Sequence, residues 1–264
     1  MMIAMPEDNA EIRKEIKEEL DEEKQNEAAA TASTADKKFA AKKVRRPRAK
    51  PASVLPEEEV KSIQSKIMLF GKYQYDVEVA DISLKNYINL TPKTYPQSFR
   101  RTSQKKFSKA TINIVERLEN ALMRGGTGGK VGGRVIRTEG RLQGKKLKTM
   151  HIIEQAFEIV NKQTGKNPLQ LLVIALENSA PIEDTTRVRY GGIISNVAVD
   201  ISASRRLDIA LRNMAMATVI GAFGSKKTIV DALANELILA ANSDVNSYAI
   251  KRKNEVERMA RSAK

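Results

Sequence analysis

Few side chains in this chain of 264 residues have the types and spacing that catalysis requires. His151 is the only histidine and there is no cysteine, which excludes a zinc-thiolate site, a paired-histidine site and a thiol nucleophile. The adjacent carboxylates Glu183 and Asp184 are a candidate acid–base pair, but they precede a basic ribbon, and we expect them to polarise the turn that leads into it. The sequence therefore predicts no catalytic residues, no metal site and no enzyme activity.

A glycine-rich segment, GGTGGKVGGRVIRTEGRLQG at 125–144, has the composition of a phosphate-binding loop. A Walker loop requires Ser or Thr after its Gly-Lys pair, whereas Val131 follows Gly129-Lys130. The G-x-G-x-x-G spacing fails as well, because the third glycine position is also Val131. We interpret 125–144 as a flexible basic loop whose glycines let backbone approach a phosphate closely, and we expect no cofactor.

Charge is the strongest compositional signal. The chain has 46 Lys and Arg against 32 Asp and Glu, a net charge of +14, and a field of that sign attracts polyanions such as nucleic acid. Residues 1–36 carry 11 acidic and 4 basic side chains, whereas 37–50 carry 8 basic and no acidic ones. We predict that 1–53 is a disordered acidic-then-basic tail, whose basic half either lies along phosphates or is a solvated linker.

The remainder, 54–264, has the apolar periodicity of helices. Ile112, Val115, Leu118 and Leu122 form one stripe, which ends before the glycine pair that opens the 125–144 loop. A second stripe predicts a helix around His151, and its members are Leu147, Met150, Ile153, Phe157 and Val160. Met214 has the spacing of a core residue in a later helix. Ahead of these helices, 73–79 alternates in polarity and predicts an extended segment over the core.

Capping residues place the starts of three further helices. Asn167 is a good cap because Pro168 takes the first helical position and Gln170 the third. Ser202 and Ser225 are the predicted caps of the two helices that follow the ribbon.

The stretch RVRYGGIISNVAVDIS predicts a two-stranded ribbon, at about 186–201, in a chain that is otherwise helical. Arg187 and Arg189 fall on one face of the first strand, and the glycine pair at 191–192 marks the bend. The predicted fold is therefore mainly α, a bundle of five to six helices with a protruding two-stranded β-hairpin arm.

Several blocks of this sequence resemble a known family. The block NPLQLLVIALENSAPIEDTTRVRYGGIISNVAVDISASRRLDIALR is very similar to the centre of the universal small-subunit ribosomal protein seven family, called protein five in eukaryotes. The flanking blocks LFGKYQYDVEVADISLKNYINL, GKKLKTMHIIEQAFEIVNKQTGKNP and SYAIKRKNEVERMARSAK agree in order, so the resemblance runs from about residue 69 to 264. The residues of these blocks resemble the archaeal form of the family more than the eukaryotic form.

The resemblance implies a structural protein that binds the 3′ major domain of small-subunit rRNA and nucleates assembly of the subunit head. It also implies contacts with tRNA and mRNA near the exit site, through hairpin residues Arg189, Tyr190, Gly191 and Gly192. The rRNA-binding residues it implies are all basic: Arg100, Arg101, Lys105, Lys106, Lys109, Lys145, Lys146, Lys148, Arg187, Arg189, Arg205, Arg206, Lys226, Lys227, Lys251, Arg252 and Lys253. Neighbouring head proteins are further expected partners.

Two segments depart from the family, and two other classes of function stay open. The 125–144 loop is longer and richer in glycine than the short basic loop of the family, and the 1–53 tail is unusual. We hypothesise that both follow local RNA or a neighbouring protein. The alternatives are a helical DNA-architectural or repressor protein and an RNA-acting enzyme. With no apolar run of roughly 18 residues and no signal-peptide pattern, we expect no membrane contact and a cytoplasmic location in the small subunit.

Overall fold

The computed structural model describes residues 67–98, 106–130, 135–137 and 141–263. The chain divides into two units, Met1–Val54 and Leu55–Lys264, and every described residue belongs to the second. The predicted tail at 1–53 and three of the predicted RNA-binding residues, Arg100, Arg101 and Lys105, lie outside the described residues.

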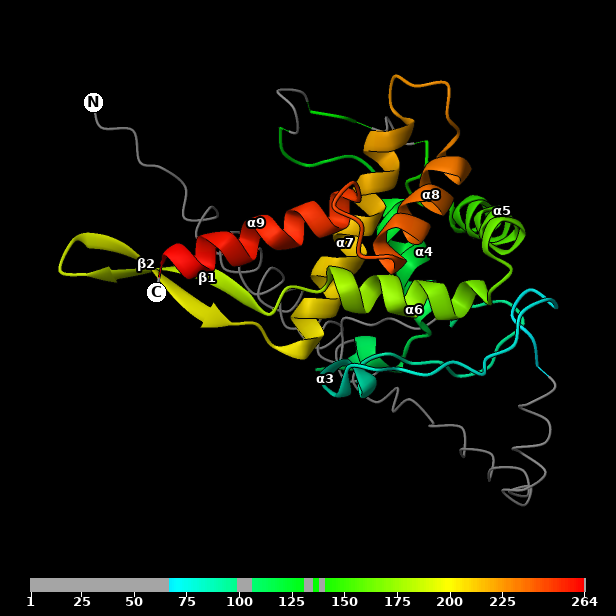
Figure 1. The fold of residues 1–264 in the computed structure, drawn as a ribbon, viewed down its shortest axis with the longest axis horizontal. Helices are drawn as coiled ribbons and strands as arrows, with labels where there is room; N and C mark the ends of the chain where they lie inside the picture. The colour runs from blue at the N-terminus through cyan, green and yellow to red at the C-terminus, as the bar shows by residue number, and fades with distance from the viewer. Residues whose placement is uncertain (1–66, 99–105, 131–134, 138–140, 264) are drawn as a thin grey trace, which may run out of the picture. The chain divides into compact units, whose positions relative to one another are not determined.

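The described residues include six helices of eleven residues or more and one hairpin, which confirms the predicted fold class. Figure 1 shows how these elements are arranged. A four-residue helix, α3 (Ile82–Lys85), precedes them, and a 3₁₀ turn spans Ser108–Thr111. The longer helices are α4 (Ile114–Arg124), α5 (Lys146–Thr164), α6 (Pro168–Ser179), α7 (Ala203–Ala222), α8 (Ile229–Ala241) and α9 (Tyr248–Ser262). The strands are β1 (Glu183–Tyr190) and β2 (Ile193–Asp200).

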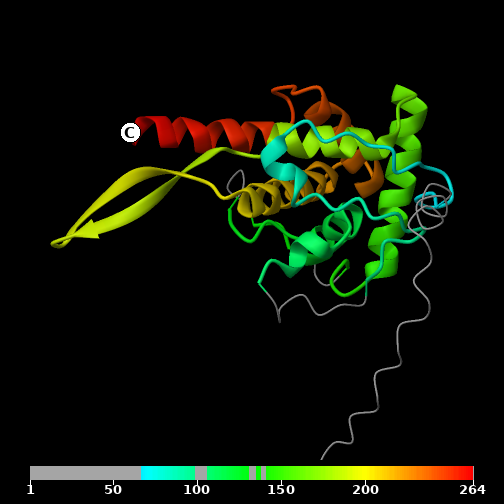
Figure 2. The same ribbon diagram turned by 90° about the horizontal axis from the view of Figure 1, so that it is seen from below.

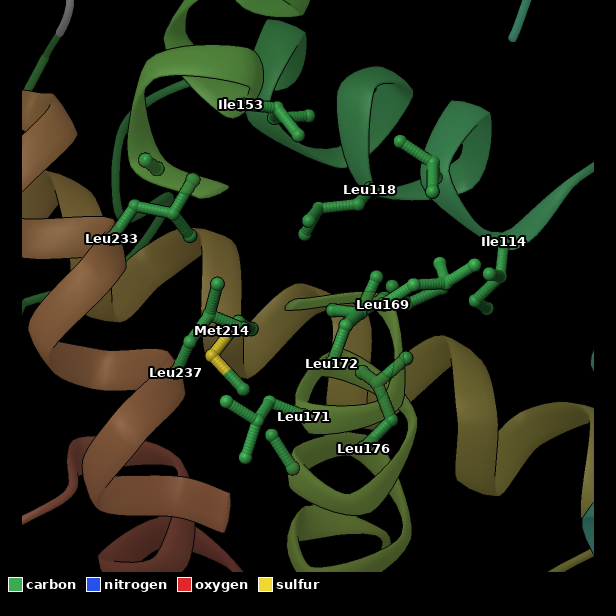
Figure 3. Packing of buried hydrophobic residues seen from close by; sticks show 14 of the residues in the cluster. Ile114, Leu118, Ile153, Leu169, Leu171, Leu172, Leu176, Met214, Leu233 and Leu237 are labelled. Atoms are coloured by element: carbon green, nitrogen blue, oxygen red, sulfur yellow. The ribbon is translucent and has the colours of Figure 1, made fainter. Parts of the chain in front are cut away.

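The core forms where α8 packs against α5, α6 and α7. Figure 3 shows Leu233 and Leu237 of α8 beside Met214 of α7 and Leu171 of α6, and all four are buried. The first predicted stripe is buried at each position. Val115, Leu118 and Leu122 lie on one face of α4, whereas Ile112 precedes the helix. The α5 stripe is buried except at Leu147, which lies in the first turn of the helix and is 63% exposed.

An extended segment before α3 lies along α6, as its alternating polarity predicted. The Gln170 side chain pairs with the backbone of Glu78 through two hydrogen bonds of 2.9 and 3.0 Å, in the manner of a neighbouring strand. Glu177 accepts hydrogen bonds from the backbone N–H groups of Ala80 and Asp81. Polar side chains of α6 thus satisfy a backbone that has no sheet partner.

Cap positions were predicted correctly for α6 and α7 and wrongly for α8. Asn167 accepts a hydrogen bond from the N–H of Leu169, and Ser202 occupies the cap position of α7 without a side-chain bond. Helix α8 begins at Ile229, so its cap is Thr228 rather than Ser225. Thr228 and Asp231 form a reciprocal capping box, which Ser225 has no acidic residue to form.

The hairpin pairs β1 with β2 from Glu183↔Asp200 to Tyr190↔Ile193. Both glycines of its turn, Gly191 and Gly192, have positive φ, which a two-residue primed turn requires. Glu183 and Asp184 lie within β1 rather than in a turn before the ribbon, so that prediction was wrong. The turn fails to form there because both residues pair with β2. Figures 1 and 2 both show the hairpin projecting from the helices with α9 along its base.

Candidate nucleic-acid interface

A groove of about 1090 Å³ lies between α4, α7 and the first residues of the 125–144 loop. Helix α4 contributes Glu116, Arg117 and Arg124 to its lining, and α7 contributes Asp208 and Arg212. Lys109, Lys146 and Arg205 complete its charged lining. Six of these eight side chains are basic, so the groove favours an anionic ligand.

Both carboxylates of the groove are already neutralised by protein cations. Asp208 binds Lys109 and Arg117, each at 2.8 Å. Burial raises the pKa of Asp208, but hydrogen bonds from Lys109 and Arg117 outweigh burial and hold this pKa below its ordinary value. Glu116 accepts hydrogen bonds from Lys146 at 2.6 Å and from Ser98. The acids of the groove therefore do not repel a polyanion.

Arg124 and Arg212 are two groove cations that stay available. Both are exposed, and neither has an ion-pair partner within the described part of the chain. Sequence reasoning overlooked both, together with the buried Arg117. The spacing of Arg205, Asp208 and Arg212 on α7 is a signal that was present, because positions three, four and seven apart share one helix face.

The predicted basic residues divide into exposed cations and cations already bound within the protein. The exposed cations without an ion pair among the described residues are Lys106, Lys145, Lys148, Arg187, Arg189, Lys226, Lys227 and Lys251. The cations that bind a partner within the protein are Lys109, Lys146, Arg205, Arg206, Arg252 and Lys253. Arg205 is nevertheless 67% exposed and lies 4.0 Å from Asp184, so it remains accessible.

Arg206 differs sharply from its neighbour Arg205. Its side chain is only 11% exposed and binds Asp81 at 2.9 Å. It also donates to the backbone carbonyl of Pro181 and to the Ser83 hydroxyl. Because its guanidinium is occupied by three protein acceptors, Arg206 joins α7 to α3 and to the end of α6.

The predicted cations do not form one continuous surface. Lys226 and Lys227 follow the C-terminal end of α7, whereas the hairpin precedes its N-terminal end. A helix of 20 residues is about 30 Å long, which separates these two groups. The groove and the hairpin lie nearer to each other, since Arg205, in the first turn of α7, lines the groove.

The two faces of the hairpin differ in chemistry. Register places Arg187 opposite Asn196 and Arg189 opposite Ile194, so the arginines share one face, as predicted. Tyr190 and Ile193 are opposite each other on the second face, with 75% and 76% of their surfaces exposed. Toward its tip the hairpin therefore carries arginines on one face and apolar side chains on the other, while Glu183 and Asp200 lie on the arginine face at its base.

One buried acid, Glu119 of α4, has no hydrogen-bond partner for either carboxyl oxygen among the described residues. Burial raises its pKa to about 8; Lys146 opposes this rise and Glu116 adds to it. Glu119 is therefore largely protonated at neutral pH.

Within the described residues, no group of three or more His, Cys, Asp or Glu is placed to hold a metal ion. No helix in that part of the chain is long and apolar enough to cross a membrane.

The fold and these surfaces define a mainly helical protein with a basic groove and a projecting hairpin that carries two exposed arginines. A model of the family described as Ribosomal protein S7p/S5e matches residues 83–264, and the chain belongs to this family of ribosomal proteins, which is not a family of enzymes. It is 43% identical over 199 residues to the small ribosomal subunit protein uS7 of Cenarchaeum symbiosum (strain A), covering 75% of this chain and 97% of that relative.

Proposed function

We propose that this chain is a structural constituent of the small ribosomal subunit in the cytoplasm. It binds the 3′ major domain of the small-subunit rRNA, nucleates assembly of the subunit head beside neighbouring head proteins, and contacts tRNA and mRNA near the exit site. Membership of the S7p/S5e family supports this proposal, and the single structural observation that carries the RNA part is the groove with neutralised acids and free arginines.

Binding in this groove is electrostatic. Arg124 and Arg212 face an RNA backbone from α4 and α7, and planar guanidinium groups bind phosphate oxygens in pairs. Each phosphate contact releases counterions, so affinity falls steeply with salt. Specificity arises from the shape of a folded RNA junction, because side chains do not read base edges in the deep groove of A-form RNA.

The hairpin extends this surface away from the helices. Strands of eight residues reach roughly 25 Å at about 3.3 Å per residue. Arg187 and Arg189 therefore contact nucleic acid well beyond the groove. At the tip, Gly191 and Gly192 have no side chain to keep a sugar-phosphate backbone at a distance.

A gel-shift titration tests the proposal. The full chain is titrated against a 3′ major domain transcript and against duplex DNA of equal length, at several salt concentrations. We expect tighter binding to the RNA, and the R124Q/R212Q double variant should weaken it by tenfold or more. The exposed pair K162Q/K166Q, at the far end of α5, is the matched charge control. Equal affinity for DNA and RNA would contradict the proposal.

A further inference from the structure

The glycine-rich loop between α4 and α5 is held to the core at defined points. Thr127 is buried, its N–H donates to the carbonyl of Ile136 at 3.1 Å, and its Oγ1 accepts from the N–H of Ile136 at 3.1 Å. The same hydroxyl donates to the carbonyl of Gly129. Two residues nine positions apart are thus joined by a pair of hydrogen bonds.

Gly126 makes this closure possible. Its φ is +78°, and a Cβ at this position would lie 2.9 Å from the carbonyl oxygen of Ile136. Because backbone cannot yield as a flexible side chain does, any larger residue would push the two arms of the loop apart.

Apolar side chains hold the loop at two further points. Ile136 is only 7% exposed, and Leu142, at 2%, belongs to the hydrophobic core. The N–H of Lys145 donates to the carbonyl of Leu142 immediately before α5 begins. The described parts of the loop therefore contact the bundle at defined residues.

Between these fixed points the loop presents cations. Lys130, Arg137, Arg141 and Lys145 are all exposed, and none has an ion-pair partner among the described residues. The start of the loop, from Gly125 to Gly128, lines the groove together with α4 and α7. The fixed cations thus continue a surface that is already basic.

We infer that the described cations of this loop, Lys130, Arg137, Arg141 and Lys145, form a second phosphate-binding surface that contacts the RNA bound in the groove. The inference rests on the proposed function and extends it to a segment that departs from the family's short loop. RNA is favoured over a protein partner because protein interfaces are rich in aromatic and apolar side chains, whereas Val135 is the one exposed large hydrophobic residue among the described loop positions. Four cations and open glycines instead suit a phosphate backbone.

This surface is tested by charge removal with the fold left intact. The triple variant K130Q/R137Q/R141Q is compared with the wild type and with K85Q/K162Q/K166Q, which removes three exposed cations away from the groove. The probe is the 3′ major domain transcript. We expect about tenfold weaker binding for the loop variant and a salt slope lower by about two to three, with the control unchanged. Circular dichroism should show the same melting temperature for all three proteins.

A second variant tests the fixing of the loop. T127V keeps every cation but removes the hydroxyl that accepts a hydrogen bond from the N–H of Ile136. We therefore expect weaker RNA binding with an unchanged slope of affinity against salt concentration. Wild-type affinity in T127V would overturn the view that these hydrogen bonds position the loop cations.

The outcomes separate the inferred role of the loop from the proposed function. If the wild type binds the transcript and the loop variant binds equally well, the inferred role of the loop is overturned and the function stands. If subunits with the loop variant keep RNA affinity but lose a neighbouring protein, the partner is a protein and the inference is wrong. If the wild type itself prefers duplex DNA, both the proposed function and the inferred role of the loop are wrong.

Discussion

The guanidinium of Arg117 on α4 donates to the carboxylate of Asp208 on α7 across 2.8 Å, while Lys109 binds the other carboxylate oxygen. The Arg117 side chain is only 6% exposed; it also donates to the Tyr87 carbonyl, but Asp208 is its one ion-pair partner among the described residues. D208N should lower the free energy of unfolding by about 1–3 kcal/mol, because a buried cation loses its counter-charge. Urea unfolding measures the loss. The control K109Q removes the exposed partner and should cost less than about 1 kcal/mol.

The same pair predicts a dependence on pH. The pKa of Asp208 is lowered in the folded state, so its stabilisation is present above the ordinary carboxyl pKa and is lost as pH falls through the folded pKa. The difference in stability between the wild type and D208N should shrink as the solution is acidified toward pH 3. A difference that grows with acidification would contradict this account.

Arg205 and Arg206 are adjacent in sequence but predict opposite phenotypes. R206A removes bonds to Asp81, Ser83 and the Pro181 carbonyl, and it should destabilise the fold by about 2 kcal/mol. R205A should change stability by less than about 0.5 kcal/mol and should weaken RNA binding instead. Thermal melts and gel shifts on the same two proteins check both statements. Equal melting temperatures would refute the structural role of Arg206.

Glu119 predicts a pH dependence of the opposite sign. Its pKa is about 8 when folded, against 4.5 ordinarily, so the folded chain retains a proton that the unfolded chain releases. Stability should therefore fall as pH rises from about 4.5 to about 8, by at most about 5 kcal/mol at roughly 1.4 kcal/mol per pKa unit. E119Q should abolish this fall, as chemical denaturation at pH 5 and pH 8.5 would reveal.

Glu158 serves as the control for that experiment. The exposed hydrogen bond from Lys72 lowers the pKa of Glu158, so its small contribution is lost in acid rather than in base. E158Q should therefore keep the fall in stability between pH 5 and pH 8.5. If E158Q abolished this fall as completely as E119Q, the assignment to Glu119 would be wrong.

The start of α8 predicts that substitutions of Thr228 and Ser225 have different effects on stability. T228A removes the capping box with Asp231 and should cost about 1 kcal/mol in the free energy of unfolding. S225A should stay within about 0.5 kcal/mol, because Ser225 is exposed and its hydroxyl only donates to the carbonyl of Gly221 in the last turn of α7 rather than capping α8. Guanidinium titrations measure the free energy of unfolding of both variants. A larger loss in S225A than in T228A would show that Ser225 is the cap of α8.

The hairpin arginines predict a loss of function with little loss of stability. Arg187 and Arg189 are exposed, so R187Q/R189Q should unfold within about 0.5 kcal/mol of the wild type. Ribosomes reconstituted with this variant should instead lose exit-site tRNA binding, measured by filter retention of labelled tRNA. Ribosomes with K162Q/K166Q provide the control. Normal tRNA retention together with a loss of several kcal/mol in fold stability would contradict the proposed role.

The sequence by itself determined the net charge of this protein and most of the longer helices and strands of its described residues. Stripes at helical spacing and the cap at Asn167 followed from local geometry, as did the hairpin turn at Gly191-Gly192, because each depends on residues close together in the chain. The cap of α8 was misjudged although the deciding residue, Asp231, is only three positions from Thr228. The sequence blocks that resemble the family could also be recognised, because each is a contiguous stretch of residues.

Only the tertiary structure decided which charges are free. Arg205 and Arg206 are equivalent in sequence, yet one faces solvent and the other binds Asp81, which is 125 residues away. Lys109 and Lys146 were predicted as RNA contacts, but α4 and α7 bring their acidic partners to them. The basic groove exists for the same reason: packing places Arg124 and Arg212 together and pairs off the acids between them. Ion pairs between distant segments have no local pattern, because burial and distance are set only when the helices pack.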